Sequence, residues 1–329
     1  LGAGKLIGVN FVDAAGMEDA ARFCRANDYY WDGVISERVN LREFIYSQAG
    51  YCLLDFQIIG GKFSLKPSVP YKDNDFTINH FTGPDIKAMF TDGNIKDLKV
   101  SYLSPEERQT FIANVVYRKE VENGFPETQS LQVSLKNSPV DDPLESFDLS
   151  GFCTSRKQAL DFAQYALKTR KLVDHGITFR TAPQYVLNLV PGDYFRLVSE
   201  VTHTNRFRNG AKLDDGTIVS KDNMTGSESV YYWQQGTEKV EIATLSRVPN
   251  GSLFTEQNTI TENKIYKLET LSYGEDGLID ISASYTPIEP SRLPNGNVNP
   301  LAGYFSVLQG WGTITSEGPD FNYSTTYKT

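Results

Sequence analysis

Residues 147–183 read F-D-L-S-G-F-C-T-S-R-K-Q-A-L-D-F-A-Q-Y-A-L-K-T-R-K-L-V-D-H-G-I-T-F-R-T-A-P and carry the strongest pattern in the chain. Thr154 and Ser155 place hydroxyls where a helix can begin, and Gln158 follows Ser155 at the spacing of a capping box. The next apolar residues recur on one helical face: Ala159, Phe162, Ala163, Ala166 and Leu167. The stretch therefore predicts an amphipathic helix with one buried side.

The residues after this helix predict a sheet. Lys168–Lys171 place cations in the last turn, where they meet the negative end of the helix dipole, and Gly176 is the expected stop. Residues 177–181 then alternate as a half-buried strand does. Residues 191–193, Pro-Gly-Asp, predict a turn, and 194–201 a returning strand. The centre of the chain is therefore one helix laid on a sheet, without a catalytic signature.

The totals exclude several classes of protein. A length of 329 residues fits two or three domains, and 40% hydrophobic with 22% charged residues is typical of a globular chain. The formal charge of −9 argues against a general nucleic-acid binder, but it suits a channel wall to which DNA does not adhere. Apolar runs are shorter than the ~20 residues of a membrane helix. Because residue 1 is Leu and residues 5–12 read as a strand, we expect the numbering to begin inside a longer polypeptide.

Three cysteines, Cys24, Cys52 and Cys153, are widely spaced in apolar contexts, with no C-x-x-C pair. An odd number at such spacing argues against a zinc site or a disulfide framework. We expect them to be small buried side chains in a protein that folds under reducing conditions.

The flanking regions predict mostly strands, with two further helices. Helices are expected at 16–27 and after Asn40, where Glu43 completes a capping box and Gly50 ends the helix. A weak helical piece is expected at Asp85–Phe90. The expected strands are 52–59 and 62–69, joined by Gly60-Gly61, then 95–103, 110–121, 129–136, 230–233, 239–245, 264–272 and 278–285, with a further hairpin at 214–216.

A search for reactive groups finds little. Gly2-Ala3-Gly4-Lys5 lacks the spacing of a phosphate loop, and residues 73–84 lack the glycine and glutamate of a calcium loop. His80, His175 and His203 lie far apart in the sequence and form no metal-binding pair. We expect His175 to be a cation near a helix C-terminus. A Cys/His nucleophile pair stays open, since folding can bring distant residues together, although no flanking motif supports one.

Two weaker hypotheses concern glycoside hydrolysis and nucleic-acid binding. Asp141, Asp142 and Glu145 could supply two carboxylates for glycoside hydrolysis, but a solvated turn explains them better. Lys168–Lys171 and Arg206–Arg208 could contact nucleic acid, but helix-end and loop charges explain them better.

Aromatic residues offer a further hypothesis. Tyr231–Trp233 and the aromatic residues of 304–327 could stack on sugars, but core and interface packing is the stronger interpretation.

The central stretch resembles the tail-tip hub family of long-tailed bacteriophages, which includes the lambda-type tip attachment protein J and the baseplate hubs of gene transfer agents. The likeness is carried by F-D-L-S-G-F-C-T-S-R-K-Q-A-L-D-F-A (147–163), H-G-I-T-F-R-T-A-P (175–183), V-P-G-D-Y-F-R-L-V (190–198), W-D-G-V-I (31–35), N-L-R-E-F-I (40–45), G-G-K-F-S-L-K-P (60–67) and I-Y-K-L-E-T-L-S-Y-G-E-D-G-L-I-D-I-S-A (265–283). It extends over about residues 20 to 290, and its motifs are structural rather than catalytic.

The resemblance implies a mainly β fold with α+β portions, built from β-barrel-type hub domains with a few packed helices. It implies a homotrimer whose ring or channel connects the tail tube to spike or receptor-binding fibres and opens for DNA ejection. A ring of this kind closes through repeated contacts between identical subunits. The family brings no catalytic, cofactor or metal-binding residues, so we expect no enzyme and no cofactor.

The implied partners are a distal tail protein ring, the tape measure protein and a spike or receptor-binding fibre. DNA would pass through the lumen without sequence-specific binding, and a host surface receptor would be contacted through following domains. The implied location is the tail tip of the virion, after assembly in the host cytoplasm.

The expected domains are an α+β domain with the glycine hairpin at 1–90, a barrel and helix-on-sheet hub domain at 91–290, and a linker with an aromatic stretch at 291–329. Residues 204–258 form an excursion within the second domain. The alternative function is a tail-associated glycan-binding module or a glycan or peptidoglycan hydrolase.

Overall fold

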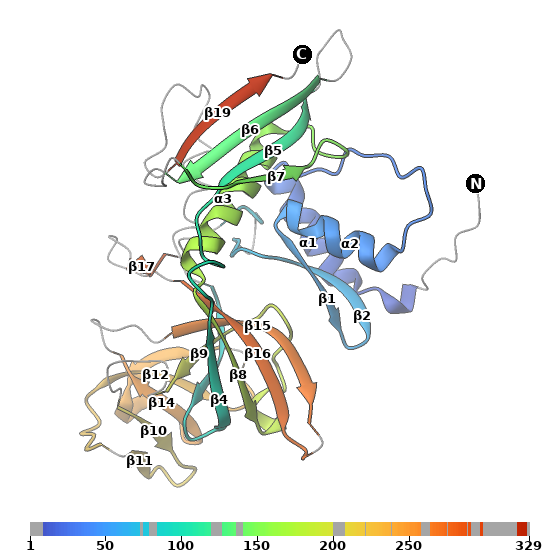
Figure 1. The fold of residues 1–329 in the computed structure, drawn as a ribbon. Helices are drawn as coiled ribbons and strands as arrows, with labels where there is room; N and C mark the ends of the chain where they lie inside the picture. Colours follow the sequence, from blue (N-terminus) through green and yellow to red (C-terminus); the bar gives the residue numbers. More distant parts are fainter. Residues whose placement is uncertain are drawn as a thin grey trace. The chain divides into compact units, whose positions relative to one another are not determined.

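The structure is a computed structural model that describes residues 9–72, 75–78, 84–119, 127–135, 141–199, 208–220, 222–237, 239–257, 264–274, 276–287, 289–290, 297–298 and 321–327. The fold is mainly β, with several sheets and a few helices, as expected (Figure 1). It divides into two compact units, one of residues 1–83, 104–172 and 288–329, the other of 84–103 and 173–287. The expected domains are 1–90, 91–290 and 291–329. Whether each of these segments folds independently is not tested by the division into two units, so the domain boundaries stay a prediction.

The first unit holds the three α-helices of the described residues. None of them is both long and apolar enough to cross a membrane. The elements of this unit are η1 (Val9–Phe11), α1 (Ala14–Ala26), α2 (Leu41–Ala49), η2 (Gly50–Cys52), β1 (Leu54–Ile59), β2 (Lys62–Pro67), β5 (Ile112–Lys119), β6 (Glu127–Leu135), β7 (Leu144–Asp148), α3 (Arg156–Leu172), β17 (Glu289–Pro290), β18 (Asn297–Val298) and β19 (Phe321–Tyr327).

The N-terminal part of this unit is the expected α+β arrangement. Asn40 caps α2 by accepting a hydrogen bond from the backbone N–H of Arg42. β1 and β2 form an antiparallel hairpin through Gly60 and Gly61, whose φ angles of +57° and +77° favour glycine. The expected strand at residues 5–12 is wrong for Val9–Phe11, a single 3-10 turn in which no strand ladder forms.

Helix α3 covers a four-stranded sheet in the order β19-β6-β5-β7 (Figure 1). The expected apolar stripe packs into the core with β5 and β6, where Ala159 and Ala163 are fully buried. The hydroxyl of Ser155 accepts a hydrogen bond from the backbone N–H of Gln158 at 3.3 Å, so the predicted start is confirmed. The predicted stop at Gly176 is wrong: α3 ends at Leu172, and Gly176 lies inside the next strand. No left-handed glycine is needed, because Val173 and Asp174 already leave the helix.

The second unit contains a six-stranded sheet and a five-stranded sheet. The six-stranded sheet has the order β3-β9-β15-β16-β8-β4, and the five-stranded sheet the order β11-β10-β14-β12-β13. The elements are β3 (Ile86–Thr91), β4 (Ile95–Tyr102), β8 (His175–Thr181), η3 (Pro183–Tyr185), β9 (Tyr194–Val198), β10 (Asn209–Lys212), β11 (Ile218–Ser220), β12 (Ser229–Gln234), β13 (Glu241–Thr244), η4 (Leu245–Arg247), β14 (Ser252–Glu256), β15 (Lys264–Tyr273) and β16 (Ile279–Thr286).

The six-stranded sheet curls into a half-barrel. Its two edge strands, β3 and β4, are consecutive in the chain and are joined only by residues 92–94. Four Cα steps span at most about 15 Å, whereas the edges of a flat six-stranded sheet lie about 24 Å apart. The short link therefore requires the sheet to bend until its edges approach each other. The closing hairpin of β15 and β16 supplies two of the middle strands, as predicted.

The predicted helical piece at Asp85–Phe90 is wrong, because β3 begins at Ile86 and pairs parallel to β9. Ala88, Met89 and Phe90 are all fully buried in the barrel core. A short apolar run that is covered on both sides has no polar alternation, so its sequence does not distinguish a strand from a helix.

The five-stranded sheet contains the hairpin predicted at residues 214–216. Its strand β10 carries Gly210, which has no room for a side chain. A Cβ atom there would lie 2.2 Å from the carbonyl oxygen of Val219 and 2.8 Å from the ring of Phe254. Glycine at this position lets three strands approach closely.

We expect Gly210→Ala to lower the free energy of unfolding by about 1–3 kcal/mol, because the new methyl group collides with backbone on a neighbouring strand. Urea denaturation followed by tryptophan fluorescence measures the change. Gly50→Ala is the control, since Gly50 has a φ of −58° and nothing within 4 Å of the added carbon. Equal stability of the two variants would contradict the packing described for Gly210.

Candidate functional site

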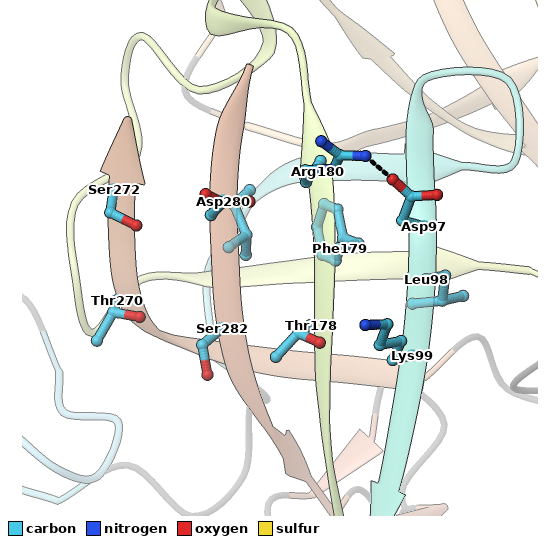
Figure 2. A pocket seen from close by; sticks show the side chains of 11 residues that line it. Asp97, Leu98, Lys99, Thr178, Phe179, Arg180, Thr270, Ser272, Asp280 and Ser282 are labelled. Carbon is cyan, nitrogen blue, oxygen red and sulfur yellow. Dashed lines mark hydrogen bonds and ion pairs between the residues drawn. The ribbon is translucent and has the colours of Figure 1, made fainter. Parts of the chain in front are cut away.

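A hollow of about 510 Å³ lies on the half-barrel sheet across β15, β16, β8 and β4 (Figure 2). We refer to it as the trough. Two rows of polar side chains cross these strands, as the pairing register requires. One row is Ser272, Asp280 and Arg180, and the other is Thr270, Ser282, Thr178 and Lys99.

Two features of the sheet produce the trough: the alternation of inward and outward side chains along each strand, and two β-bulges. Phe179 and Ile281 point into the barrel core, so their neighbours Thr178 and Ser282 face solvent. The pairing is interrupted on both flanks, between Leu268 and Thr270 in β15 and between Lys96 and Lys99 in β4. Bulges increase the local twist of a strand. The flanking strands therefore turn relative to the two central strands and border the hollow.

Charge in the trough is balanced within the lining. Arg180 forms an ion pair with Asp97 (Figure 2) and a second one, at 2.6 Å, with Asp276, which lies outside the lining. Asp280 and Lys99 add one charge of each sign. The other polar groups are hydroxyls, which both donate and accept hydrogen bonds. This arrangement can hold an uncharged polar ligand, and its hydroxyls have no histidine beside them that could act as a base.

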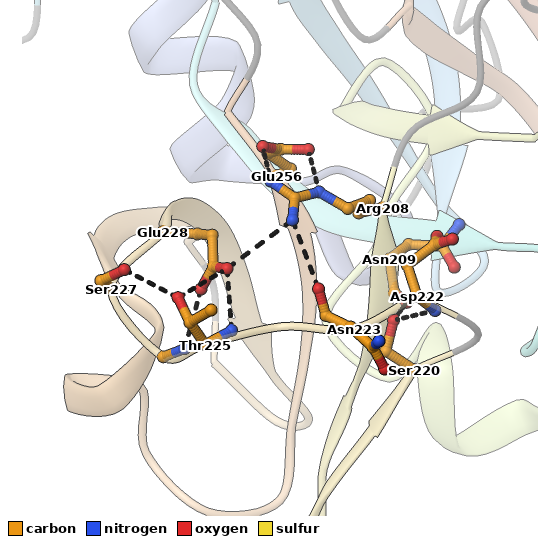
Figure 3. Close-up of polar contacts among 10 residues, drawn as sticks. Arg208, Asn209, Ser220, Asp222, Asn223, Thr225, Ser227, Glu228 and Glu256 are labelled. Carbon is orange, nitrogen blue, oxygen red and sulfur yellow. Dashed lines mark hydrogen bonds and ion pairs between the residues drawn. The ribbon is translucent and has the colours of Figure 1, made fainter.

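A second polar cluster holds a loop of the five-stranded sheet in place (Figure 3). Arg208 binds both carboxylate oxygens of Glu256 and contacts the backbone carbonyl of Asn223 at 3.4 Å. Glu228 accepts hydrogen bonds from the backbone N–H groups of Thr225 and Gly226, which hold its pKa at about 2, below the usual value. The positive charge of Arg208 is therefore paired with a carboxylate of the protein itself.

The carboxylates proposed for glycoside hydrolysis are not arranged as a free pair. Both oxygens of Glu145 are bound by Arg170, at 3.0 and 3.1 Å. The interpretation as a solvated turn holds for Asp141, which lies in a turn and is exposed. It does not hold for Asp142, which is half-buried with one buried carboxylate oxygen, or for Glu145, which lies in β7. Arg170 thus occupies both carboxylate oxygens of Glu145 through a two-pronged ion pair.

The basic segments do not form a nucleic-acid surface in the described residues. Lys168 is buried and Arg170 is paired with Glu145, which leaves Lys171 exposed at the end of α3. Arg206 and Phe207 lie outside the described residues, and Arg208 is paired as stated above.

The aromatic residues Tyr231–Trp233 on β12 pack against the protein rather than lie exposed to solvent. Trp233 is only 4% exposed, and its indole N–H donates to the carbonyl of Thr237 at 3.2 Å. The Tyr231 ring packs against the barrel core, with the Arg196 guanidinium 4.1 Å from its centre. The interpretation of this run as core packing is confirmed.

The expectation that His175 is a cation near a helix C-terminus does not fit its surroundings, because it begins strand β8 and is buried. The ring is 2% exposed and stacks on Tyr285, and its two nitrogens contact Asp174 at 2.5 Å and the hydroxyl of Tyr266 at 2.9 Å. Burial lowers the pKa of His175, against a smaller opposing effect of Asp174. The histidine is therefore a buried residue whose ring packs among tyrosines. His80 and His203 lie outside the described residues.

Sequence reasoning missed a buried polar face on α3. The carboxylate of Asp161 is 1% exposed, accepts a hydrogen bond from the Tyr29 hydroxyl at 2.7 Å and lies 3.8 Å from the ammonium of Lys157. Burial raises the pKa of Asp161 to about 7, against the smaller opposing effects of Lys157 and Tyr29. The repeated spacing of Lys157, Asp161 and Gln164 was the available signal, since these residues share one helical face.

No grouping of three or more His, Cys, Asp or Glu side chains suited to a metal ion occurs among the described residues. The cysteines are free, with Cys52 and Cys153 buried and Cys24 half-buried.

Neither a protein-family model nor a curated protein sequence matches this chain. A solved structure of the virion of a native gene transfer agent particle matches at 12% identity and a TM-score of 0.39, covering 82% of this chain and 46% of the matched one. A tail protein from Neisseria meningitidis MC58 matches at 8% identity and a TM-score of 0.33, covering 69% and 58%.

A 43 kDa tail protein of prophage MuSo2 from Shewanella oneidensis matches at 8% identity and a TM-score of 0.31, covering 76% of this chain and 54% of that one. The chain thus spans about half the length of the structures it matches. The matched structures are a gene transfer agent virion and two tail proteins, at identities and TM-scores too low to establish a common function.

We expect Asp161→Asn to stabilise the protein more at pH 8 than at pH 5. The folded pKa of about 7 lies above the ordinary value of 3.8. The folded state therefore keeps a proton that the unfolded state loses between these values, and stability falls as pH rises through this window, by about 1.4 kcal/mol for each pH unit. Asparagine accepts the Tyr29 hydrogen bond without titrating.

Urea unfolding of both proteins at pH 5 and pH 8 measures the difference in unfolding free energy. Glu37→Gln, at an exposed position, is the control and should show no such change. A constant difference at both values of pH would show that Asp161 does not titrate in this range.

Proposed function

We propose that this chain is a structural component of a bacteriophage tail, located at the tail tip as part of the baseplate hub. The proposal rests on a direct contact between two segments that resemble the family. They are W-D-G-V-I (31–35) and the G-F-C-T portion (151–154) of the central stretch. The ring of Trp31 lies parallel to that of Phe152, with centres 6.0 Å apart. The backbone N–H of Asp32 donates to the carbonyl of Phe152 at 2.7 Å.

Further contacts make the two motifs one structural unit. The carboxylate of Asp32 accepts a hydrogen bond from the Thr154 hydroxyl at 2.6 Å, and its backbone carbonyl accepts one from Arg118 at 2.8 Å. A Cβ atom on Gly33 would lie 2.6 Å from the Trp31 ring and 2.9 Å from the carbonyl oxygen of Gly151. Residues of the two motifs that resemble the family thus make the contacts that hold the motifs together. Their resemblance therefore concerns the fold, which supports a structural role.

The finer role follows from the resemblance. Three copies form a ring at the distal end of the tail, in contact with a distal tail protein ring and the tape measure protein on one side and a spike or receptor-binding fibre on the other. DNA passes through the lumen during ejection, and the charge of −9 suits a wall that does not retain it. A host receptor is reached through following domains. The chain occupies the tail tip of the virion after assembly in the host cytoplasm, and this role needs no enzymatic activity.

We expect the purified chain to have a molar mass near three times 36.8 kDa. Light scattering across a range of concentrations measures the mass, and electron microscopy of the same sample tests for threefold particles. A monomer at every concentration, without threefold particles, would contradict the trimer.

The second candidate function is a glycan-binding module, and the trough favours it. Its hydroxyls stand on neighbouring strands, one interstrand spacing of about 4.8 Å apart, close to the length of one sugar ring. The balanced charge suits a neutral glycan. The hydrolase alternative is less favoured, because Arg170 occupies the carboxylate of Glu145.

We expect the double variant Thr178→Val, Ser282→Ala to bind neutral polysaccharide about tenfold more weakly than the wild type if the trough is a glycan site, since two hydrogen bonds are lost. Affinity electrophoresis in gels containing bacterial surface polysaccharide measures the change. Ser101→Ala is the control, because Ser101 lies on β4 beyond the trough. Absence of binding by the wild type would remove this candidate and leave the structural role unaffected.

A further inference from the structure

We propose that the second unit carries a binding slot for one alkylammonium group, of the size of a lysine side chain or a choline headgroup. The slot has a volume of about 150 Å³ and is lined by β10, β12 and β14 of the five-stranded sheet and by Tyr185 of η3. Cavities of about this volume hold one benzene-sized group in other proteins, so the slot suits a single compact group. The slot and the trough share no residue, so the inference stands apart from the glycan candidate and from the tail role.

Two aromatic rings and two aliphatic side chains form the apolar part of the slot. The register of the sheet places Ala211, Leu253 and Trp233 side by side on neighbouring strands, with their side chains on the same face. Tyr185 adds a second ring, whose centre lies 6.3 Å from that of Trp233 and whose plane is inclined to it by 45°. Aromatic rings attract a cation placed over their faces, and groups of such rings bind alkylammonium ligands.

One carboxylate at the slot supplies a negative charge. Asp214 lies in the turn between β10 and β11, and its Oδ1 would be 2.9 Å from a Cβ atom on Gly251, another residue of the lining. Glycine at position 251, where φ is +75°, thus leaves room for this carboxylate. In the part of the chain that the structure describes, the carboxylate of Asp214 forms no hydrogen bond or ion pair. It is therefore available to a cationic ligand.

The other charged residue of the lining does not pair with Asp214. The ammonium of Lys212 donates hydrogen bonds to the backbone carbonyls of Ser246 and Val248, at 3.3 and 2.7 Å. The register places this side chain on the opposite face of the sheet from the Trp233 ring. The slot thus combines aromatic rings with an unpaired carboxylate, and the net charge of −9 adds a general attraction for cations.

Hydrogen bonds hold the surroundings of the slot in place without a ligand. The side-chain amide of Asn188, in the loop after η3, donates to the carbonyl of Gly236 at 2.9 Å. The side-chain amide of Asn250 donates to the backbone carbonyl of Asp214 at 3.0 Å. A site that is formed in advance loses little conformational freedom on binding. A compact cation can therefore bind without first ordering these loops.

The test uses the full-length chain labelled with fluorotryptophan and follows its fluorine NMR signals during titration with choline chloride, with sodium chloride as the ionic-strength control. Trp31→Phe and Trp311→Phe each remove one of three signals, which leaves the third as that of Trp233. We expect choline to shift the Trp233 signal to saturation, with a dissociation constant in the millimolar range. The neutral carbon isostere of choline has the same shape without the charge, and it should bind about fivefold more weakly.

Matched variants test the ring and the carboxylate separately. Tyr185→Phe keeps the ring and should bind choline as the wild type does, whereas Tyr185→Leu should bind it about fivefold more weakly. Asp214→Asn should bind it about threefold more weakly. The control is Asp215→Asn, which removes the same charge one residue away and keeps an oxygen that can accept the hydrogen bond from the backbone N–H of Thr217. This control should bind choline as the wild type does.

A second probe, lysine with blocked backbone ends, distinguishes two sources of the ammonium group. Tighter binding of this probe supports a slot for a basic segment of a partner protein, and tighter binding of choline supports a slot for a small quaternary ammonium compound. The comparison of choline with its isostere needs no variant, so the test stands where a substitution impairs folding. Equal binding of these two compounds, equal losses in Asp214→Asn and Asp215→Asn, or a Trp233 signal that does not move would each overturn the inference.

Discussion

Helix α3 is covered on both of its faces, and the first unit depends on this constraint. One face is apolar and packs on β5 and β6, whereas the other meets the N-terminal α+β part through polar side chains. A buried polar group must find a hydrogen-bond partner, or the fold loses stability. Gln158 and Asp161 find theirs at Tyr30 and Tyr29, more than a hundred residues earlier in the chain. These bonds help to fix where the N-terminal part docks, because they join α3 to backbone and side-chain groups of that part.

The second unit depends on a constraint of a different kind, the three-residue link between β3 and β4. It forces the six-stranded sheet to curl, and the bulges in β4 and β15 absorb part of the curvature. The trough is a consequence of these two features, since its polar rows lie on the strands that the bulges flank. Its residues therefore come from four strands whose order differs from their order in the chain.

Sequence patterns correctly predicted those elements whose structure is determined by residues close to them in the sequence. The glycine hairpin at 60–61, the start of α3 and the closing hairpin each carry their signal within about twenty residues, and the structure confirms them. The errors concern positions whose surroundings come from elsewhere. Phe90 lies in a strand that a parallel partner covers, and His175 is enclosed by tyrosines far away in the sequence. The trough could not be predicted, because it requires the register of four strands.

Ion pairs within the protein determine how many arginine side chains are free to bind an anionic partner. Arg170, Arg180 and Arg208 are each bound to carboxylates of the same unit. A nucleic-acid surface gains affinity by neutralising phosphates with free cations, and a guanidinium already paired with a carboxylate contributes little to that term. The pairing thus keeps these cations from acting as phosphate contacts, so the net charge of −9 is not offset by a local basic patch at these sites. These pairs also cross-link segments within each unit, since Arg170 joins α3 to β7 and Arg208 binds Glu256 on β14.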